Sequence, residues 1–185
     1  NLPDVLAFGL ATGTPLLICT TGFNDDEIEQ IQAAGASSPV LWSTNTSYGV
    51  NLLRFLLEDV AEKLIDYDVE IVEKHHNKKK DAPSGTAKTL AGAVSKGRGA
   101  YKYGRGLEDG ARIPGEIGIH AVRGGSIVGE HDVIFAGAGE VLTFSHQAQS
   151  KEVFSSGALK TGRWLVNQPA GFYEMKDVFM KEEKA

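Results

Sequence analysis

Two short, uninterrupted apolar runs constrain the fold of this chain more than any other feature. They cover residues 16–19 and 39–42. Continuous apolar runs of this length are typical of strands that are buried on both faces, as in a parallel sheet. Between them, Asn24 followed by Glu27 has the capping-box pattern that predicts the start of a helix. Strand, helix and strand in this order predict a right-handed crossover and a parallel α/β sheet.

The middle of the chain has a different pattern. Residues 48–64 carry an apolar stripe at helical spacing with charged residues on the other side, which predicts a long amphipathic helix. Further on, polar and apolar residues alternate, which is typical of strands with one face against helices. These segments are residues 68–74, 117–122, 126–135 and 141–147. They predict an α+β part with a mixed sheet of roughly four strands, interrupted by a long, mobile loop over residues 95–115.

The stretch of residues 73–86 concentrates the chemistry of the chain. It reads EKHHNKKKDAPSGT, so two imidazoles and three ammonium groups follow a predicted strand. Pro83 and Ser84 then predict the start of a helix, with Ser84 as its N-cap. The free N–H groups of a helix N-terminus favour an anion. The stretch therefore predicts a site for a small molecule that carries carboxylates.

Residue types within this stretch suit proton transfer and carboxylate binding. His75 can give or take a proton near neutral pH, and Lys79 can donate a proton and hold an anion. The N–H groups of Gly85 and Thr86 can bind one carboxylate together, because Gly85 has no Cβ to keep a ligand away. Each piece alone has a simpler interpretation, as a solvated lysine loop or a structural histidine pair. Their combination at this spacing favours a site.

Composition excludes several classes of function. The net charge of -5 over 185 residues argues against a nucleic-acid partner, because phosphate binding needs a basic face. No apolar run approaches the roughly 20 residues that span a bilayer, so no membrane partner is expected. The only cysteine, Cys19, excludes an internal disulfide and fits the reducing cytoplasm, where we expect the protein.

The histidines do not predict a metal site. His120, His131 and His146 lie far apart in the sequence, whereas metal sites usually contain a tight pair of ligands. His75 and His76 are adjacent on a predicted strand and would point to opposite faces. We therefore expect no metal.

The 73–86 stretch resembles the signature of the 4-hydroxy-tetrahydrodipicolinate reductases, also called dihydrodipicolinate reductases. The resemblance extends over residues 20–23, 45–51, 115–125, 128–131, 135–137 and 157–158. It implies an oxidoreductase that transfers a hydride from NADH or NADPH to 4-hydroxy-tetrahydrodipicolinate, giving tetrahydrodipicolinate in lysine and diaminopimelate biosynthesis. It also implies a homotetramer in which copies pair through the mixed sheet.

The resemblance also implies roles for individual residues. His75 is the expected catalytic acid or base and Lys79 the expected proton donor, while His76, Gly85 and Thr86 are expected to bind the substrate. The expected cofactor-binding residues are Cys19, Thr20, Thr21, Ser43, Thr44, Asn45, Thr46, Lys151 and Phe154. Three of them depart from the family pattern, which has a glycine at Cys19, an aromatic residue at Thr46 and an arginine at Lys151.

Two domains are expected on the same basis. Residues 1–46 and 151–185 would form the C-terminal half of a Rossmann-like dinucleotide-binding domain, and residues 47–150 an α+β domain for substrate binding and oligomerisation. No Gly-x-Gly-x-x-Gly follows a predicted strand, so we expect the Gly-rich half to precede Asn1. The residues that select NADH or NADPH belong to that half, which leaves both cofactors open.

Two other hypotheses are compatible with the residues. In the first, the chain is a truncated dicarboxylate-binding module without nucleotide binding or catalysis. In the second, the run of three lysines contacts an anionic polymer, although the negative net charge argues against it.

Overall fold

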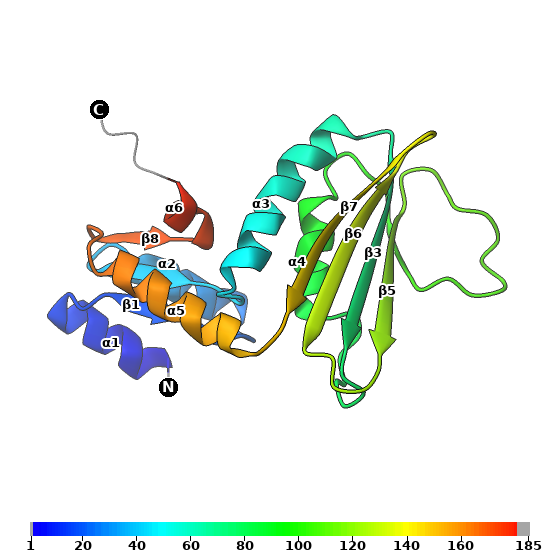
Figure 1. Cartoon of the computed structure of the whole chain (residues 1–185). Coiled ribbons are helices and arrows are strands. Elements are labelled where there is room, and N and C mark those ends of the chain that lie inside the picture. Colours follow the sequence, from blue (N-terminus) through cyan, green and yellow to red (C-terminus); the bar gives the residue numbers. More distant parts are fainter. Residues whose placement is uncertain (1, 181–185) are drawn as a thin grey trace. The chain divides into compact units, whose positions relative to one another are not determined.

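The computed structural model describes residues 2–180. The chain divides into two compact units, residues 1–51 together with 152–185, and residues 52–151. Figure 1 shows the elements of each unit along the chain.

The first unit contains a parallel three-stranded sheet. Its strands are β1 (Leu16–Ile18), β2 (Pro39–Trp42) and β8 (Gly171–Tyr173), in the order β1-β2-β8. Both strand pairs are parallel. The two apolar runs thus form neighbouring parallel strands, which confirms the predicted crossover. The helices of this unit are α1 (Leu2–Thr12), α2 (Asp25–Ala34), α5 (Glu152–Leu165) and α6 (Met175–Phe179).

The capping box predicted at the start of α2 is present. The Asn24 side chain accepts a hydrogen bond from the Glu27 backbone N–H, and the Glu27 carboxylate accepts one from the Asn24 N–H, both at 2.9 Å. Two N–H groups that the helix leaves unpaired are satisfied in this way. Local side-chain chemistry therefore sets where α2 begins.

Helices pack on both faces of this sheet, which is why its strands are apolar throughout. On one face, Leu16, Ile18 and Val40 pack with residues of α1 and α2 such as Leu6 and Ile31. On the other face, Leu17 lies against α5, where a Cβ at Gly162 would be 3.9 Å from its side chain. A strand covered on both sides can bury every apolar side chain that it carries.

Strand β8 was not predicted. Three residues are too few to show a strand period, and the pairing of β8 with β2 is a tertiary contact. The end of α2 passes close to it, since a Cβ at Gly35 would lie 2.6 Å from the Phe172 backbone nitrogen. Glycine at this position allows the two segments to pass.

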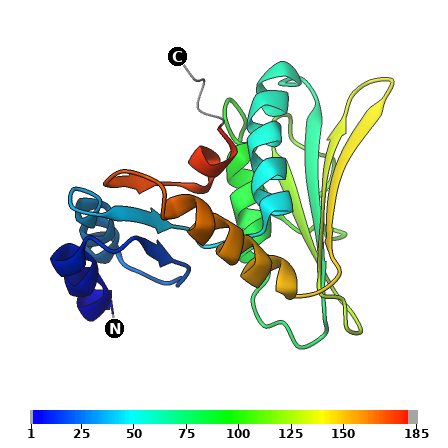
Figure 2. The ribbon, with the colours of Figure 1, turned by 60° about the vertical axis from the view of Figure 1, so that its left-hand side comes forward.

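The second unit contains a mixed sheet of five strands in the order β4-β5-β3-β6-β7. The strands are β3 (Asp68–His75), β4 (Tyr101–Tyr103), β5 (Ile117–Arg123), β6 (Gly129–Ala136) and β7 (Val141–Ala148). β3 is parallel to β5 and antiparallel to β6, which confirms a mixed sheet. The long helix α3 (Tyr48–Lys63) and the helix α4 (Gly85–Ala93) cover one face of this sheet (Figures 1 and 2).

The core of the second unit lies between these helices and the sheet. Leu57 of α3 and Leu90 of α4 are fully buried against strand residues such as Ile71, Ile117 and Phe135. On β3 the buried side chains alternate with partly exposed ones, and Glu73 continues the buried series. A carboxylate thus occupies an inward position of the sheet.

The sheet has one strand more than expected, because the segment expected to be a mobile loop over residues 95–115 contains β4. β4 pairs in parallel with β5, and Gly99 donates a backbone hydrogen bond to Gly115 at 2.7 Å. Arg98 in the same segment donates to the carbonyls of Leu64 and Tyr67, just after α3. These tertiary contacts leave no periodic signal in so short a strand, so the sequence pattern did not reveal them.

Among the described residues, no helix is both long enough and apolar enough to cross a membrane.

Candidate active site

A buried carboxylate lies at the centre of the candidate site. The Glu73 side chain is completely buried near the end of β3. Its Oε1 accepts hydrogen bonds from the Ser84 backbone N–H at 3.0 Å and from Arg123 Nη2 at 2.7 Å. Its Oε2 accepts one from Arg123 Nη1 at 2.8 Å and lies 2.5 Å from His75 Nδ1. Strand register explains the cluster, since β5 places Arg123 beside His75.

The surroundings of Glu73 keep it ionised. Burial alone would raise the pKa of Glu73, but the hydrogen bonds from Arg123, His75 and Ser84 outweigh burial and lower the pKa below its usual value. The charge of Arg123 offsets the cost of placing this carboxylate inside the protein. The group is therefore a carboxylate at neutral pH.

His75 ends β3 and is mostly buried. Its ring meets the ring of His131 edge to face, with the centroids 5.3 Å apart. Its other nitrogen, Nε2, lies beside Gly129, where a Cβ would come within 3.1 Å. A glycine on β6 therefore leaves space next to the nitrogen that Glu73 does not contact.

Lys79 lies in the loop that follows β3. Its Nζ forms an ion pair with both carboxylate oxygens of Asp81, at 2.8 and 2.9 Å, and this pair holds the pKa of Asp81 below its usual value. The Lys79 N–H also donates to the carbonyl of His76, which is partly exposed. Lys78 and Lys80 are exposed, whereas the Lys79 side chain is only 21% exposed.

Electrostatics places His75 and Lys79 near the same buried group, His131. Burial is the largest cause that lowers the pKa of His131, to about 4, and the charges of His75 and Lys79 lower it further. β6 pairs His131 with His146 of β7, so histidines far apart in the sequence are neighbours in the sheet. No group of three His, Cys, Asp or Glu side chains within residues 2–180 is arranged to hold a metal ion.

Helix α4 begins at this cluster. Ser84 is its N-cap, as predicted, because the Ser84 hydroxyl accepts from the Ala87 N–H at 3.1 Å. The same hydroxyl is 3.0 Å from His131 Nε2. Gly85 is exposed, and nothing lies within 4 Å of where its Cβ would be. The first turn of α4, which contains Gly85 and Thr86, therefore has open space beside its backbone.

The residues expected to bind the cofactor follow β1 and β2 in the first unit. Because these strands are adjacent and parallel, Thr20, Thr21, Ser43 and Thr44 come after the same edge of the sheet. A backbone hydrogen bond from Ser43 to Ile18, at 3.0 Å, ties the two strand ends together. Thr20, Thr21 and Thr44 are exposed, so their hydroxyls are accessible to a ligand.

Other expected cofactor residues have different surroundings. Thr46 is buried, and its hydroxyl donates to the Phe154 carbonyl at 2.7 Å, so this side chain is engaged within the protein. Asn45 accepts a hydrogen bond from the Ser47 N–H through its side chain. Cys19, Lys151 and Phe154 are exposed.

Sequence reasoning did not assign functional roles to Glu73 and Arg123. Arg123 is 50 residues from Glu73 in the chain, and only the pairing of β3 with β5 brings them together. One signal was present, because Glu73 continues the inward series of Val69 and Ile71, where a charge needs a partner.

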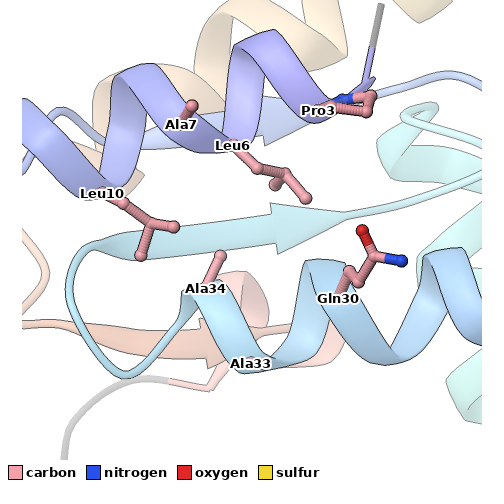
Figure 3. Close-up of a pocket in the computed structure, with 7 residues that line it drawn as sticks. All are labelled: Pro3, Leu6, Ala7, Leu10, Gln30, Ala33 and Ala34. Carbon is pink, nitrogen blue, oxygen red and sulfur yellow. The ribbon is translucent and has the colours of Figure 1, made fainter.

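A hollow elsewhere in the first unit lacks such groups. It lies between α1 and α2 and is lined by apolar residues such as Leu6, Leu10 and Ala34, with Gln30 as a polar side chain (Figure 3). A hollow of this kind offers no group for proton transfer.

Known proteins match the chain over both units. A family model described as "Dihydrodipicolinate reductase, N-terminus" matches residues 2–46, and one described as "Dihydrodipicolinate reductase, C-terminus" matches residues 49–179. The 4-hydroxy-tetrahydrodipicolinate reductase of Caldanaerobacter subterraneus subsp. tengcongensis is 48% identical over 183 residues, which are 97% of this chain and 73% of the relative. That of Exiguobacterium sp. AT1b is 44% identical, over 96% of this chain and 72% of the relative.

A solved structure is also similar. Dipicolinate-bound dihydrodipicolinate reductase from Paenisporosarcina sp. TG-14 has a TM-score of 0.74 and 25% sequence identity, and the match covers 97% of this chain and 71% of that one. A parallel Rossmann-like sheet followed by a mixed-sheet unit with a His–Lys site defines an α/β oxidoreductase. This chain belongs to the dihydrodipicolinate reductase family, which confirms the resemblance of the 73–86 stretch.

Proposed function

We propose that this protein reduces 4-hydroxy-tetrahydrodipicolinate to tetrahydrodipicolinate with NADH or NADPH, with loss of water. This reaction belongs to lysine and diaminopimelate biosynthesis. The observation that carries the proposal is the match to reductases of this name along 97% of the chain, which includes both the strand ends of the first unit and the 73–86 stretch. The site geometry agrees chemically, since it combines an imidazole, an ammonium group and an open helix start.

The second unit supplies the groups for the substrate. Gly85 and Thr86 at the start of α4, together with His76, are proposed to bind a substrate carboxylate, because helix N-termini attract anions. Lys79 holds a second negative charge. Its pair with Asp81 is half open to solvent, with Asp81 58% exposed, and such pairs contribute only about 0–1 kcal/mol. A substrate carboxylate can therefore replace Asp81 at low cost.

Proton transfer is assigned to His75, with Lys79 as a second donor. The mostly buried ring of His75 is held between Glu73 and His131, and its Nε2 borders the space beside Gly129. A group that delivers a proton must be within hydrogen-bond reach of the reacting atom. The buried surroundings limit competing transfer to bulk water.

The first unit supplies the cofactor contacts. The exposed hydroxyls of Thr20, Thr21 and Thr44 at the strand ends fit a polar ligand such as the nicotinamide end of NADH or NADPH, and ligands of such sheets bind at this edge. The cofactor, when bound, supplies the hydride. Cys19, Ser43, Asn45, Lys151 and Phe154 complete the proposed set. Thr46 belongs to it only through its backbone, because its hydroxyl bonds to Phe154.

The proposal extends to domains, assembly and location. Residues 1–46 and 151–185 are assigned to the dinucleotide-binding domain and residues 47–150 to the substrate-binding and oligomerisation domain, supported by a boundary between the family models at residues 46 and 49. A homotetramer is proposed through the sheet face opposite α3 and α4. Val122, Ile134 and Val141 expose apolar surface on that face. The enzyme is assigned to the cytoplasm.

Replacing both proposed proton donors tests the function. The variant H75Q/K79M is expected to lose turnover while keeping its thermal unfolding temperature, measured by nicotinamide oxidation with substrate generated in the assay. K78M/K80M is the matched control, because these exposed lysines flank Lys79 and are expected to be dispensable. Undiminished turnover in H75Q/K79M would contradict the assigned roles. Binding of pyridine-2,6-dicarboxylate by a wild-type protein that binds no nucleotide would favour the non-catalytic module instead.

A further inference from the structure

We propose that Glu73 is a positioning residue that fixes the imidazole of His75 in one tautomer, with the proton on Nδ1, and thereby presents Nε2 to the substrate. This inference rests on the proposed function, because it assigns a direction to the proton transfer of the same site. The carboxylate itself does not touch the substrate, since its four hydrogen bonds enclose it completely.

The hydrogen bonds of Glu73 use its whole capacity. A carboxylate has about four acceptor positions and no donor. Two are taken by Arg123, one by the Ser84 N–H and one by His75. Because these partners come from three different elements, the carboxylate cannot turn without losing several bonds at once. Its position is therefore fixed by the fold.

This arrangement determines the protonation of His75. Glu73 Oε2 can only accept, and it lies 2.5 Å from His75 Nδ1, so that nitrogen must carry a proton. In the neutral ring Nε2 is then an acceptor, and in the charged ring Nε2 is a donor. All proton exchange with a substrate consequently takes place at Nε2. That atom borders Gly129, the position where a Cβ would lie only 3.1 Å away.

Arg123 connects Glu73 to the second catalytic candidate. Besides its two bonds to Glu73, its Nη2 donates to the backbone carbonyl of Asp81 at 2.7 Å. Asp81 is the residue that pairs with Lys79. The same carboxylate therefore orders the His75 ring directly and the loop of Lys79 through Arg123. Buried ion pairs often contribute little net stability, so stability alone does not account for this arrangement.

Replacing Glu73 by glutamine tests the inference. In Glu73→Gln one oxygen becomes an NH₂ group. Turned toward Ser84, this NH₂ would face two donors, the Ser84 N–H and Arg123. Turned toward His75, it faces Arg123 and a ring that can change tautomer. The second orientation is therefore favoured, and His75 is expected to shift its proton to Nε2. Nitrogen NMR of the imidazole at a pH where the ring is neutral reads this directly, without any activity.

Kinetics provides a second readout. Loss of a group that orients a functional histidine typically lowers activity about 10–100-fold. We expect kcat to fall by this factor in Glu73→Gln, with a smaller change in KM. Because Arg123 is left without its charge partner in that variant, the double variant E73Q/R123Q restores a neutral pair and guards against simple unfolding. It is expected to stay as slow as E73Q.

A matched control is available on the same strand. Glu70 also contacts a histidine, with Oε2 2.7 Å from His120 Nε2, but on the opposite side of β3. Glu70→Gln is expected to leave kcat and the His75 tautomer unchanged. This variant separates a general effect of removing a carboxylate from β3 from the specific effect at Glu73.

The outcomes separate the inference from the function. A proton that stays on Nδ1 in E73Q, wild-type kcat in E73Q, or recovery of wild-type kcat in E73Q/R123Q would each overturn the positioning role. A tautomer shift in E73Q with the expected fall in kcat supports it. A wild-type protein that holds the Nδ1 proton but shows no reductase activity would contradict the proposed function, while still supporting control of the His75 tautomer by Glu73.

Discussion

At the scale of single residues, a few buried polar groups determine the behaviour of the candidate site. Glu73 and His131 lie side by side on β3 and β6, facing the helices, with 0% and 4% of their surface exposed. Their environments act in different ways. Hydrogen-bonded cations keep Glu73 charged, whereas burial keeps His131 neutral.

The neutral state of His131 predicts a dependence of stability on pH. Its pKa is about 4 in the folded protein, below its ordinary value of 6.5, so the unfolded chain binds more protons between these values. Stability is then full above about pH 6.5 and falls as the pH is lowered toward 4. Between pH 7 and 5 the free energy of unfolding should decrease by about 2 kcal/mol, as measured by urea unfolding.

A variant isolates this contribution. His131→Gln keeps a polar group near the Ser84 hydroxyl but cannot titrate, so its stability should vary less between pH 7 and 5. Some slope remains, because burial also lowers the pKa of His146. An equal slope in wild type and variant would show that protonation of His131 does not limit stability in this range.

Sequence reasoning reached the ends of the site network but not its centre. His75, Lys79 and the cap Ser84 lie in one contiguous stretch, so the pattern of residue types was enough to single them out. Glu73 lies in the same stretch, but its partner Arg123 comes from another strand. A pairing of this kind depends on sheet register, which one sequence does not reveal.

At the scale of helices and strands, the predictions succeeded where the signal was local. The capping box of α2, the N-cap of α4 and the apolar runs of β1 and β2 all formed as expected. The strands β4 and β8 were missed, since each has three residues and exists through pairing with a neighbour. Tertiary pairing decides such segments, and propensity does not.

Helix α5 offers a test of close packing in the first unit. A Cβ at Gly157 would lie 1.9 Å from the Thr46 carbonyl oxygen, so Gly157→Ala must displace the backbone after β2. Forced overpacking typically costs about 1–3 kcal/mol. We expect a lower thermal unfolding temperature and weaker NADH or NADPH binding by calorimetry, because Thr46 adjoins the proposed cofactor residues.

The same helix provides the control. A Cβ at Gly162 would meet Leu17 at 3.9 Å, an ordinary contact. Gly162→Ala is therefore expected to be neutral or to stabilise by up to about 1 kcal/mol, because alanine is the better helix former. Equal effects of the two substitutions would contradict the packing of Gly157 against Thr46.

At the scale of the whole molecule, two units with different sheets divide the proposed work. The parallel sheet has helices on both faces and ends in hydroxyl side chains, and the mixed sheet carries the acid–base groups near α4. The class of each sheet followed from the sequence, because continuous and alternating apolar patterns differ. Family membership followed from the 73–86 stretch together with the other matching segments.

The proposed homotetramer can be tested on the open face of the mixed sheet. Val122 is 45% exposed there, so Val122→Asp should leave the fold of each copy intact. A charge buried between copies without a partner is costly. We expect sedimentation analysis to show a tetramer for the wild type and smaller species for the variant. A wild-type protein that sediments as a monomer would contradict the proposed assembly.

The most direct test of the central claim follows the hydride itself. Protein is incubated with 4-hydroxy-tetrahydrodipicolinate and with NADH or NADPH that carries deuterium at the transferable position, and the product is analysed by mass spectrometry. Our account predicts tetrahydrodipicolinate that contains the deuterium, formed by the wild type and K78M/K80M but not by H75Q/K79M. Unlabelled product, or no product from the wild type with either cofactor, would contradict it.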